Sequence, residues 1–239
     1  NRLNINFTLC SISKEDEIFN IINEEDFVWL DGYQFTEDYK KLLQQQVFKL
    51  IETNDIPYEA KNVDIIFNHS PGVAASHFGQ TTAQLYLGLD YALLRQSFLE
   101  YAKAHSKSPK GKGVFICFGG ADNFNLGYKF VQKLITKNFR DPIYWVTAQK
   151  NKDLDLPQNV EVLSNLDEFQ MIDYMLKSKV LLIPSSVLSF EGIALRKPIF
   201  TGYFVDNQKL IFEGLKKDEL AECFGYLETD EDVDNVLIP

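Results

Sequence analysis

The chain has 239 residues and a formal charge of −10, from 24 basic and 34 acidic side chains. Hydrophobic residues make up 45% and charged residues 24%, as in folded globular proteins, and 13 Gly and 8 Pro exclude a collagen-like or low-complexity chain. No apolar run approaches the roughly 18–20 residues of a membrane span. The negative charge argues against a broad nucleic-acid surface and leaves a local basic groove open. A phosphate ligand stays compatible with this charge, because helix N-termini bind phosphate without net positive charge.

The three cysteines, Cys10, Cys117 and Cys223, are too few and too widely spaced for a disulfide framework or a zinc motif. Cys10 and Cys117 stand in strand-like apolar runs, so we expect buried thiols. Unpaired thiols favour a reducing, cytoplasmic setting. The N-terminus lacks the basic region and apolar core of a signal peptide, and the chain opens at Asn1 without Met, as a fragment or a processed product would.

Short apolar runs alternate with helical patterns along the chain. The expected strands are β-branched or aromatic, and several are apolar at consecutive positions, as in strands buried on both faces. They are Phe27–Leu30, Val47–Ile51, Val63–Phe67, Gly113–Phe118, Ile143–Thr147, Val160–Leu163, Val180–Ile183 and Pro198–Thr201. The expected helices are Lys14–Glu25, Thr36–Gln46, Leu93–Ala104, Asn123–Lys137, Leu166–Lys177 and Ser189–Arg196. This alternation predicts the α/β class, with parallel sheets and right-handed crossovers.

One stretch has the composition of an interdomain linker. Residues Ala104–Gly113 are polar, basic and rich in Gly and Ser, and they separate a helix from a strong strand. We therefore expect Rossmann-like domains at 1–104 and 113–239, joined by a linker at 105–112. The three lysines of this stretch form either a solvated linker or a phosphate patch, and the solvated linker is favoured because charge runs usually face water.

Paired glycines follow the buried strand that ends at Phe118. The sequence continues Gly119-Gly120-Ala121-Asp122, with Asp122 or Asn123 as the N-cap of the next helix. A tight turn between strand and helix explains this pattern as well as a ligand loop does. In the ligand interpretation the glycines let the backbone approach a diphosphate, and the unpaired amides at the helix N-terminus bind it.

A second buried strand also ends in small polar residues, in the segment Pro184–Glu191 (PSSVLSFE). Ser185 and Ser186 can donate hydrogen bonds to phosphate oxygens, or one of them simply caps the helix. Glu191 either satisfies the helix dipole or accepts hydrogen bonds from a ribose diol. This loop and the glycine loop follow strands of the same half, and the carboxyl ends of parallel strands are where α/β sheets bind ligands.

Two further strand ends carry polar side chains. Tyr33 follows the strand Phe27–Leu30, where its phenol either reaches into a cleft between the domains or packs with its hydroxyl bound to backbone. Asn207 and Gln208 follow the strand Pro198–Thr201, where local sequence favours a helix cap. The three histidines, His69, His77 and His105, have no metal-ligand spacing, so we expect no metal.

Five motifs occur together and in order. They are DGYQF (Asp31–Phe35), LGLDYALLRQSF (Leu87–Phe98), FGGADNFNL (Phe118–Leu126), PSSVLSFE (Pro184–Glu191) and NQ (Asn207–Gln208). With these motifs the chain resembles the UDP-2,4-diacetamido-2,4,6-trideoxy-β-L-altropyranose hydrolase family of the pseudaminic acid pathway, including its spore-coat polysaccharide relatives. The resemblance runs over about Phe27–Leu215.

The resemblance implies a GT-B-like fold of two Rossmann-like domains, and hydrolysis of a UDP-linked deoxyamino sugar to free sugar and UDP. It implies a UDP-sugar as the partner, and no cofactor. The nucleotide-binding positions it implies are Gly119, Gly120, Asp122, Ser185, Ser186 and Glu191, with the glycines beneath the diphosphate and the glutamate on the ribose. The catalytic positions it implies are Tyr33 and Asn207, in a cleft near the sugar and the attacking water.

The chain departs from the family at three places. Nothing like the family's opening GxGH loop, whose His is its leading acid/base candidate, precedes Asp31, so the first domain is incomplete relative to the family. The family's usual Asp-Asp is reduced to Asn54-Asp55, and Gly127 stands where the family commonly has Thr. Loss of the His would remove acid/base help worth about 10²–10⁴-fold in rate.

Three explanations fit these departures: an incomplete chain, a variant that binds nucleotide without hydrolysing it, or a different base in a related reaction. The functional hypotheses are accordingly a UDP-sugar hydrolase, a non-catalytic sugar-nucleotide-binding protein, and a glycosyltransferase of the same architecture. Fold-level analogy does not choose among them.

Overall fold

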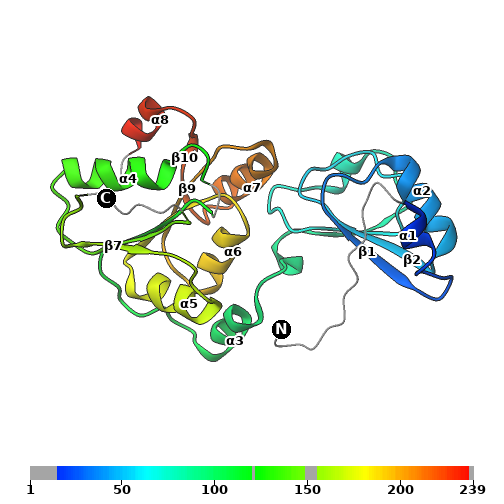
Figure 1. The fold of residues 1–239 in the computed structure, drawn as a ribbon, viewed down its shortest axis with the longest axis horizontal. Coiled ribbons are helices and arrows are strands. Elements are labelled where there is room, and N and C mark those ends of the chain that lie inside the picture. The colour runs from blue at the N-terminus through cyan, green and yellow to red at the C-terminus, as the bar shows by residue number, and fades with distance from the viewer. Residues whose placement is uncertain (1–14, 120–121, 149–154, 237–239) are drawn as a thin grey trace. The chain divides into compact units, whose positions relative to one another are not determined.

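The computed structural model describes residues 15–119, 122–148 and 155–236 (Figure 1). These residues form two compact units. The first comprises the described residues up to Asn68 together with Ala74–Leu87, and the second comprises His69–Val73 and the described residues from Gly88 onward. Every strand pair in both units is parallel, so the expected α/β class with two parallel sheets is confirmed.

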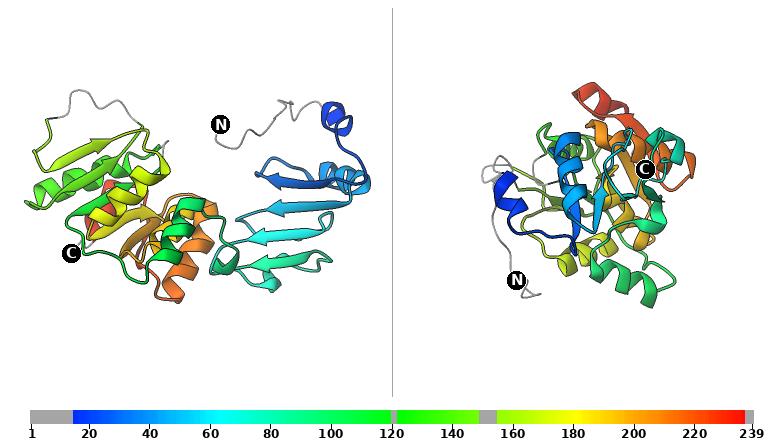
Figure 2. Two further views of the ribbon diagram at one scale, coloured as in Figure 1. Left: turned by 90° about the horizontal axis from the view of Figure 1, so that it is seen from below. Right: turned by 90° about the vertical axis from the view of Figure 1, so that its right-hand side faces the viewer.

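The first unit contains a four-stranded sheet with the order β1-β2-β3-β4, drawn side by side in Figure 2. Its elements are α1 (Glu15–Phe19), β1 (Phe27–Asp31), α2 (Glu37–Gln46), β2 (Lys49–Thr53), β3 (Ile65–Asn68), a 3-10 helix (Ala75–Phe78) and β4 (Gln84–Leu87). Thr36 starts α2 by accepting a hydrogen bond from the Tyr39 amide, as a threonine N-cap does.

Successive strand residues point to opposite faces of this sheet. The face against α2 includes the buried side chains of Leu30, Leu50 and Ile66, and α2 itself buries Tyr39 and Leu43. The rings of Trp29, Phe67 and Tyr86 stack on the other face, with centroid distances of 5.1 and 4.8 Å. The sheet is thus packed on one face by a helix and lined on the other by an aromatic row.

The second unit contains a six-stranded sheet with the order β10-β9-β8-β5-β6-β7. Its strands are β5 (Val114–Cys117), β6 (Ile143–Val146), β7 (Val160–Leu163), β8 (Val180–Pro184), β9 (Ile199–Tyr203) and β10 (Glu222–Tyr226). Its helices are a 3-10 turn (Leu89–Tyr91), α3 (Gln96–Ala104), α4 (Leu126–Thr136), α5 (Glu168–Lys177), α6 (Val187–Ala194), α7 (Asp206–Lys217) and α8 (Asp230–Asn235).

Helices cover both faces of this second sheet. Figure 1 shows α4 and α8 on one side and α3, α5 and α6 on the other. Two apolar cores follow from this arrangement, one around Phe130 and Trp145 beneath α4, and the other around Phe98, Phe115 and Met175 beneath α3 and α5. Because β5 and β8 are covered on both sides, every residue of both strands is buried.

All eight expected strands are present, with ends shifted by a few residues. Two strands, β4 and β10, were not predicted from the sequence. β4 reads Gln-Leu-Tyr-Leu and is only partly buried, so it lacks the continuous apolar run of an internal strand. β10 is interrupted by a register shift between Cys223 and Gly225. The helix α7 was not assigned either, although the Asn207-Gln208 pair predicted a helix cap there.

The division between the units differs from the expected linker at 105–112. The units separate at Leu87/Gly88, and α3 belongs to the second unit. The physical reason is packing: Phe98 of α3 is fully buried in the core formed with α5 and the sheet. The loop between α3 and β5 was predicted as a linker because its composition is polar and basic. The structure places this loop inside the second unit. None of the described helices has the length and apolarity needed to span a membrane.

Candidate functional site

The strand order of the second unit reverses between β5 and β8. From β5 the chain builds outward through β6 and β7, and from β8 it builds the other way through β9 and β10. In open parallel sheets the carboxyl ends of the strands at such a reversal are where ligands bind. The two loops singled out by the sequence, after Phe118 and after Pro184, flank this reversal.

Gly119 follows β5 with a left-handed backbone, at φ +84°. The residue is exposed, and a Cβ placed on it would meet no heavy atom within 4 Å. Its backbone conformation, rather than crowding, therefore favours glycine, and the open space lets a ligand approach the main chain closely. Gly120, the second glycine of the predicted loop, lies outside the described residues.

Asp122 is buried, and its carboxylate is bonded to the start of the next helix. Its Oδ1 accepts a hydrogen bond from the Leu126 amide at 2.8 Å and its Oδ2 accepts one from the Gly127 amide at 2.9 Å. The helix α4 begins at Leu126, three residues later than expected, and Asp122 caps its first turn. Burial raises the pKa of Asp122, and the two amides partly offset that rise. Because these amides are bound by a carboxylate, a diphosphate at this loop would contact the backbone around Gly119.

The two serines after β8 have different surroundings. Ser185 is fully buried, with its Oγ 3.0 Å from Oγ1 of Thr201. Ser186 is partly buried and is the N-cap of α6, where its Oγ accepts a hydrogen bond from the Leu188 amide at 3.3 Å. Ser186 is therefore the serine that stands at the N-terminus of α6, while Ser185 joins β8 to β9.

Glu191 is 3% exposed and is held by Arg95. Nε of Arg95 donates to Oε1 and Nη2 donates to Oε2, both at 2.7 Å. The hydrogen bond to Glu191 raises the pKa of Arg95, whose guanidinium also lies 4.7 Å from the ring centre of Phe98. Sequence reasoning missed Arg95, because its partner is 96 residues away and no local pattern connects the two.

Cys117, the last residue of β5, lies near this ion pair. Burial, above all, raises the pKa of its thiol to about 11. The side chain is 7% exposed. At neutral pH it is therefore a protonated core side chain, and not a thiolate nucleophile.

The two predicted catalytic residues lie in different units. Tyr33, 58% exposed in the first unit, donates its hydroxyl proton to Oδ2 of Asp55 at 3.0 Å. Sequence reasoning noted Asp55 only as a departure from the family. In the second unit Asn207 is partly buried at the second position of α7. Its neighbour Gln208 accepts a hydrogen bond from the Phe204 amide at 3.1 Å and so fixes the turn into α7.

The histidines serve local packing. His69 is buried with its ring 5.0 Å from that of Phe190, and His105 stacks on Tyr101. His77 accepts a hydrogen bond from the Ala74 amide. The described part of the chain contains no cluster of three or more His, Cys, Asp or Glu side chains that could hold a metal ion.

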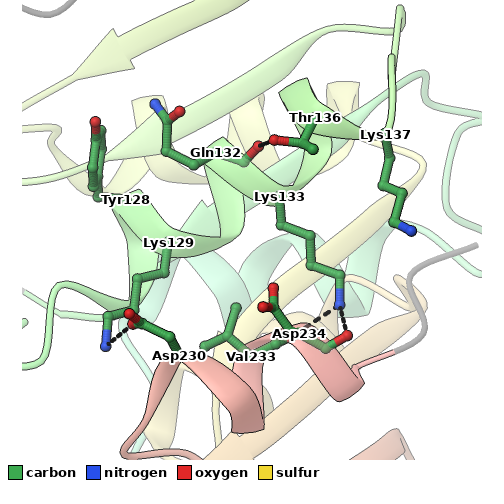
Figure 3. A pocket seen from close by; sticks show the side chains of 9 residues that line it. All are labelled: Tyr128, Lys129, Gln132, Lys133, Thr136, Lys137, Asp230, Val233 and Asp234. Carbon is green, nitrogen blue, oxygen red and sulfur yellow. Dashed lines mark hydrogen bonds and ion pairs between the residues drawn. The ribbon is translucent and has the colours of Figure 1, made fainter.

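A groove of about 510 Å³ lies between α4 and α8 (Figure 3). Lys129 pairs with Asp230 at 2.8 Å, and Lys133 donates to the carbonyls of Val233 and Asp234 at 2.7 and 2.8 Å. Figure 3 shows these lysines reaching from α4 to α8. The side chains thus join two helices, and the described residues that line the groove include none from the loops after β5 and β8.

Comparison with known proteins gives distant similarities. No protein-family model matches the chain. An uncharacterized protein of Methanocaldococcus jannaschii is 26% identical over 227 residues, which cover 87% of this chain and 46% of that protein. A mutant O-GlcNAc transferase of Thermobaculum terrenum is similar in structure with a TM-score of 0.44 and 14% identity, covering 86% of this chain and 48% of the transferase. The chain spans about half the length of each.

Proposed function

We propose that the second unit binds the diphosphate of UDP at the reversal between β5 and β8, and that the protein hydrolyses a UDP-linked deoxyamino sugar. One observation carries the binding proposal: two loops of ligand-binding composition flank the strand reversal. The sugar and the reaction are supported by the resemblance of five ordered motifs to the hydrolase family. The unpaired cysteines favour a cytoplasmic setting.

The proposed diphosphate contacts are backbone groups and one hydroxyl. Gly119 leaves space for close approach, and the resemblance adds Gly120 as the second glycine of this loop. At α6 the first amides point out of the helix N-terminus, where the dipole favours an anion and Ser186 adds a hydroxyl. Asp122 and Ser185 support this site by holding the two loops.

Glu191 is proposed to act together with Arg95. Both carboxylate oxygens are bound by the guanidinium, so a ribose hydroxyl at Glu191 would share an oxygen with Arg95. The Arg95 side chain is 39% exposed and adds a positive charge beside α6. The pair would thus supply both an acceptor for ribose and a charge that favours the bound anion.

The proposed reaction is a substitution by water. The water oxygen attacks the anomeric carbon, the bond from that carbon to the diphosphate oxygen breaks, and UDP leaves with the electron pair while the water proton passes to a base. Tyr33 and Asn207 are proposed to contact the reacting groups, as the resemblance implies. The family it resembles carries out this step without a metal.

The test is release of UDP from the purified full chain, with UDP-2,4-diacetamido-2,4,6-trideoxy-β-L-altropyranose and UDP-N-acetylglucosamine as alternative substrates. We expect UDP and free sugar from the deoxyamino substrate. Binding of UDP without release would support a non-catalytic binding protein. Transfer to an added sugar acceptor would support a glycosyltransferase. A chain that neither binds UDP nor releases it from these substrates would contradict the proposal.

A further inference from the structure

The carboxyl edge of the first unit's sheet carries a tyrosine–aspartate pair. Tyr33 lies in the turn after β1, and Asp55 lies in the segment after β2, the neighbouring strand. Carboxyl ends of parallel strands are where α/β sheets place ligand-contacting groups. The 3.0 Å hydrogen bond from the Tyr33 hydroxyl to Asp55 Oδ2 joins two residues 22 positions apart into one polar group.

The backbone conformation of Gly32 sets the direction in which the chain enters Tyr33. Gly32 has a φ of +142°, and a Cβ on it would lie 2.5 Å from Oε1 of Gln34. The turn before Tyr33 therefore favours glycine. The tyrosine side chain itself is 58% exposed, and an exposed side chain loses rotamer freedom only when a contact at its tip holds it. Asp55 supplies such a contact.

The segment that carries Asp55 is itself held on both sides. The Asn54 amide donates to the Phe67 carbonyl on β3 at 3.2 Å, and the Ile56 amide donates to Oδ1 of Asn54 at 2.9 Å. Nδ2 of Asn54 donates to Oε1 of Glu52 at 3.2 Å. The residue before Asp55 is thus bonded to the sheet, and the residue after Asp55 is bonded to that residue.

Glu52 continues this network into the interior. It is 1% exposed, and Nζ of Lys40 donates to both of its oxygens at 3.0 Å. The hydroxyl of Tyr58 donates to the same carboxylate. A buried carboxylate with all of these donors is firmly oriented. Asp55 therefore follows a residue, Asn54, that is hydrogen-bonded both to β3 and to this buried carboxylate.

We infer that Asp55 is a positioning residue for Tyr33, an inference that rests on the proposed hydrolysis. Asp55 accepts the hydrogen bond of the phenol and fixes the tip of a largely exposed side chain at the sheet edge. Because the hydroxyl hydrogen points to Asp55, the Tyr33 oxygen meets the substrate as a hydrogen-bond acceptor. The groups it suits are donors, which on a diacetamido sugar are hydroxyl and amide N–H groups.

The test is a double-mutant cycle on UDP release, with Tyr33→Phe, Asp55→Ala and the double variant. We expect each single substitution to lower kcat about 10- to 100-fold, because small displacements of a positioned group cost that much. Since Asp55 acts through Tyr33, the double variant should be no slower than Tyr33→Phe alone. The conservative variant Asp55→Asn retains an acceptor and should recover much of the lost kcat.

Two controls complete the experiment. Glu59→Gln removes an exposed carboxylate that follows Asp55 before β3 and pairs with Lys61, and it should leave kcat unchanged. The affinity for UDP, measured by titration calorimetry, should be the same in all variants. Losses that multiply in the double variant, or an Asp55→Ala enzyme as fast as wild type, would overturn the inference. A wild-type chain that binds UDP without releasing it would contradict the hydrolysis instead, and the inference would fall with it.

Discussion

Arg95 and Glu191 form a bidentate ion pair, with both nitrogen–oxygen distances at 2.7 Å. Arg95 is the N-cap of α3, and Glu191 lies within α6. The pair therefore fastens α3 to the helix whose N-terminus stands at the strand reversal. Because Glu191 is 3% exposed, Arg95 supplies the hydrogen bonds and the opposite charge that water supplies to an exposed carboxylate.

Removing Arg95 should destabilise the second unit. Arg95→Met leaves the Glu191 carboxylate buried without its cation, at a cost of about 1–3 kcal/mol, less than for a fully buried pair because Arg95 is 39% exposed. Arg95→Lys should recover only part, because an ammonium does not reproduce the two-point contact. The measurement is urea unfolding in a Trp29→Phe background, where Trp145 alone reports on the second unit. Arg140 is an exposed arginine of the same unit, and a loss no larger than that of Arg140→Met would contradict the account.

Gly127 should tolerate no side chain. A Cβ on it would lie 2.6 Å from Nε1 of the buried Trp145. We expect Gly127→Thr to cost about 1–3 kcal/mol of stability, as overpacking does. Combined with Trp145→Leu, the same substitution should cost markedly less, as thermal unfolding followed by circular dichroism would show. An equal cost in both backgrounds would contradict the steric explanation.

The buried Lys40–Glu52 pair should matter more than an exposed one. Lys40→Met leaves a 1%-exposed carboxylate without its cation and should cost about 3–5 kcal/mol. The double variant Lys40→Met/Glu52→Leu should lose less than the sum of its parts. Lys49→Met, which breaks the more exposed Lys49–Asp64 pair, should cost at most about 1 kcal/mol. Urea unfolding in a Trp145→Phe background, with Trp29 as reporter, checks this order, and equal losses for both lysines would refute it.

Cys117 should make stability fall at high pH. Its thiol pKa is raised by burial from an ordinary 9.0 to about 11 in the folded protein. Below about pH 9 the thiol is protonated in both the folded and the unfolded state, so its ionisation takes nothing from the free energy of unfolding. Between about pH 9 and 11 the unfolded thiol ionises while the folded one does not, so up to about 2–3 kcal/mol is lost as pH rises. Urea unfolding across this range should show a shallower decline for Cys117→Ala, and identical declines would contradict the shift.

Much of the fold follows from local pattern. Strands such as Val180–Pro184 read as continuous apolar runs because helices cover both faces of the sheet. β4 lacks that pattern because its residues are only partly buried. The helix α3 was assigned to the wrong unit, because the basic segment after it has the composition of a linker while Phe98 packs into the second core.

The site was predictable only in outline. The glycine loop and the serine loop stood out because each ends a buried strand, and the sheet order then brought them to one reversal. The roles of Asp122 and Ser185 in holding those loops depend on hydrogen bonds to Leu126, Gly127 and Thr201 that composition does not reveal. Arg95 and Asp55 were missed for a related reason, since each acts through a partner distant in sequence.

The central claim is that the second unit binds UDP at the strand reversal, and titration calorimetry of the full chain with UDP tests it most directly. The account predicts micromolar binding, about −8 kcal/mol. It also predicts that Gly119→Val, which places a side chain in the open space over the loop, weakens binding at least tenfold, while Gly225→Ala on β10 leaves it unchanged. No binding of UDP at millimolar concentration, or equal affinity in wild type and Gly119→Val, would contradict the account.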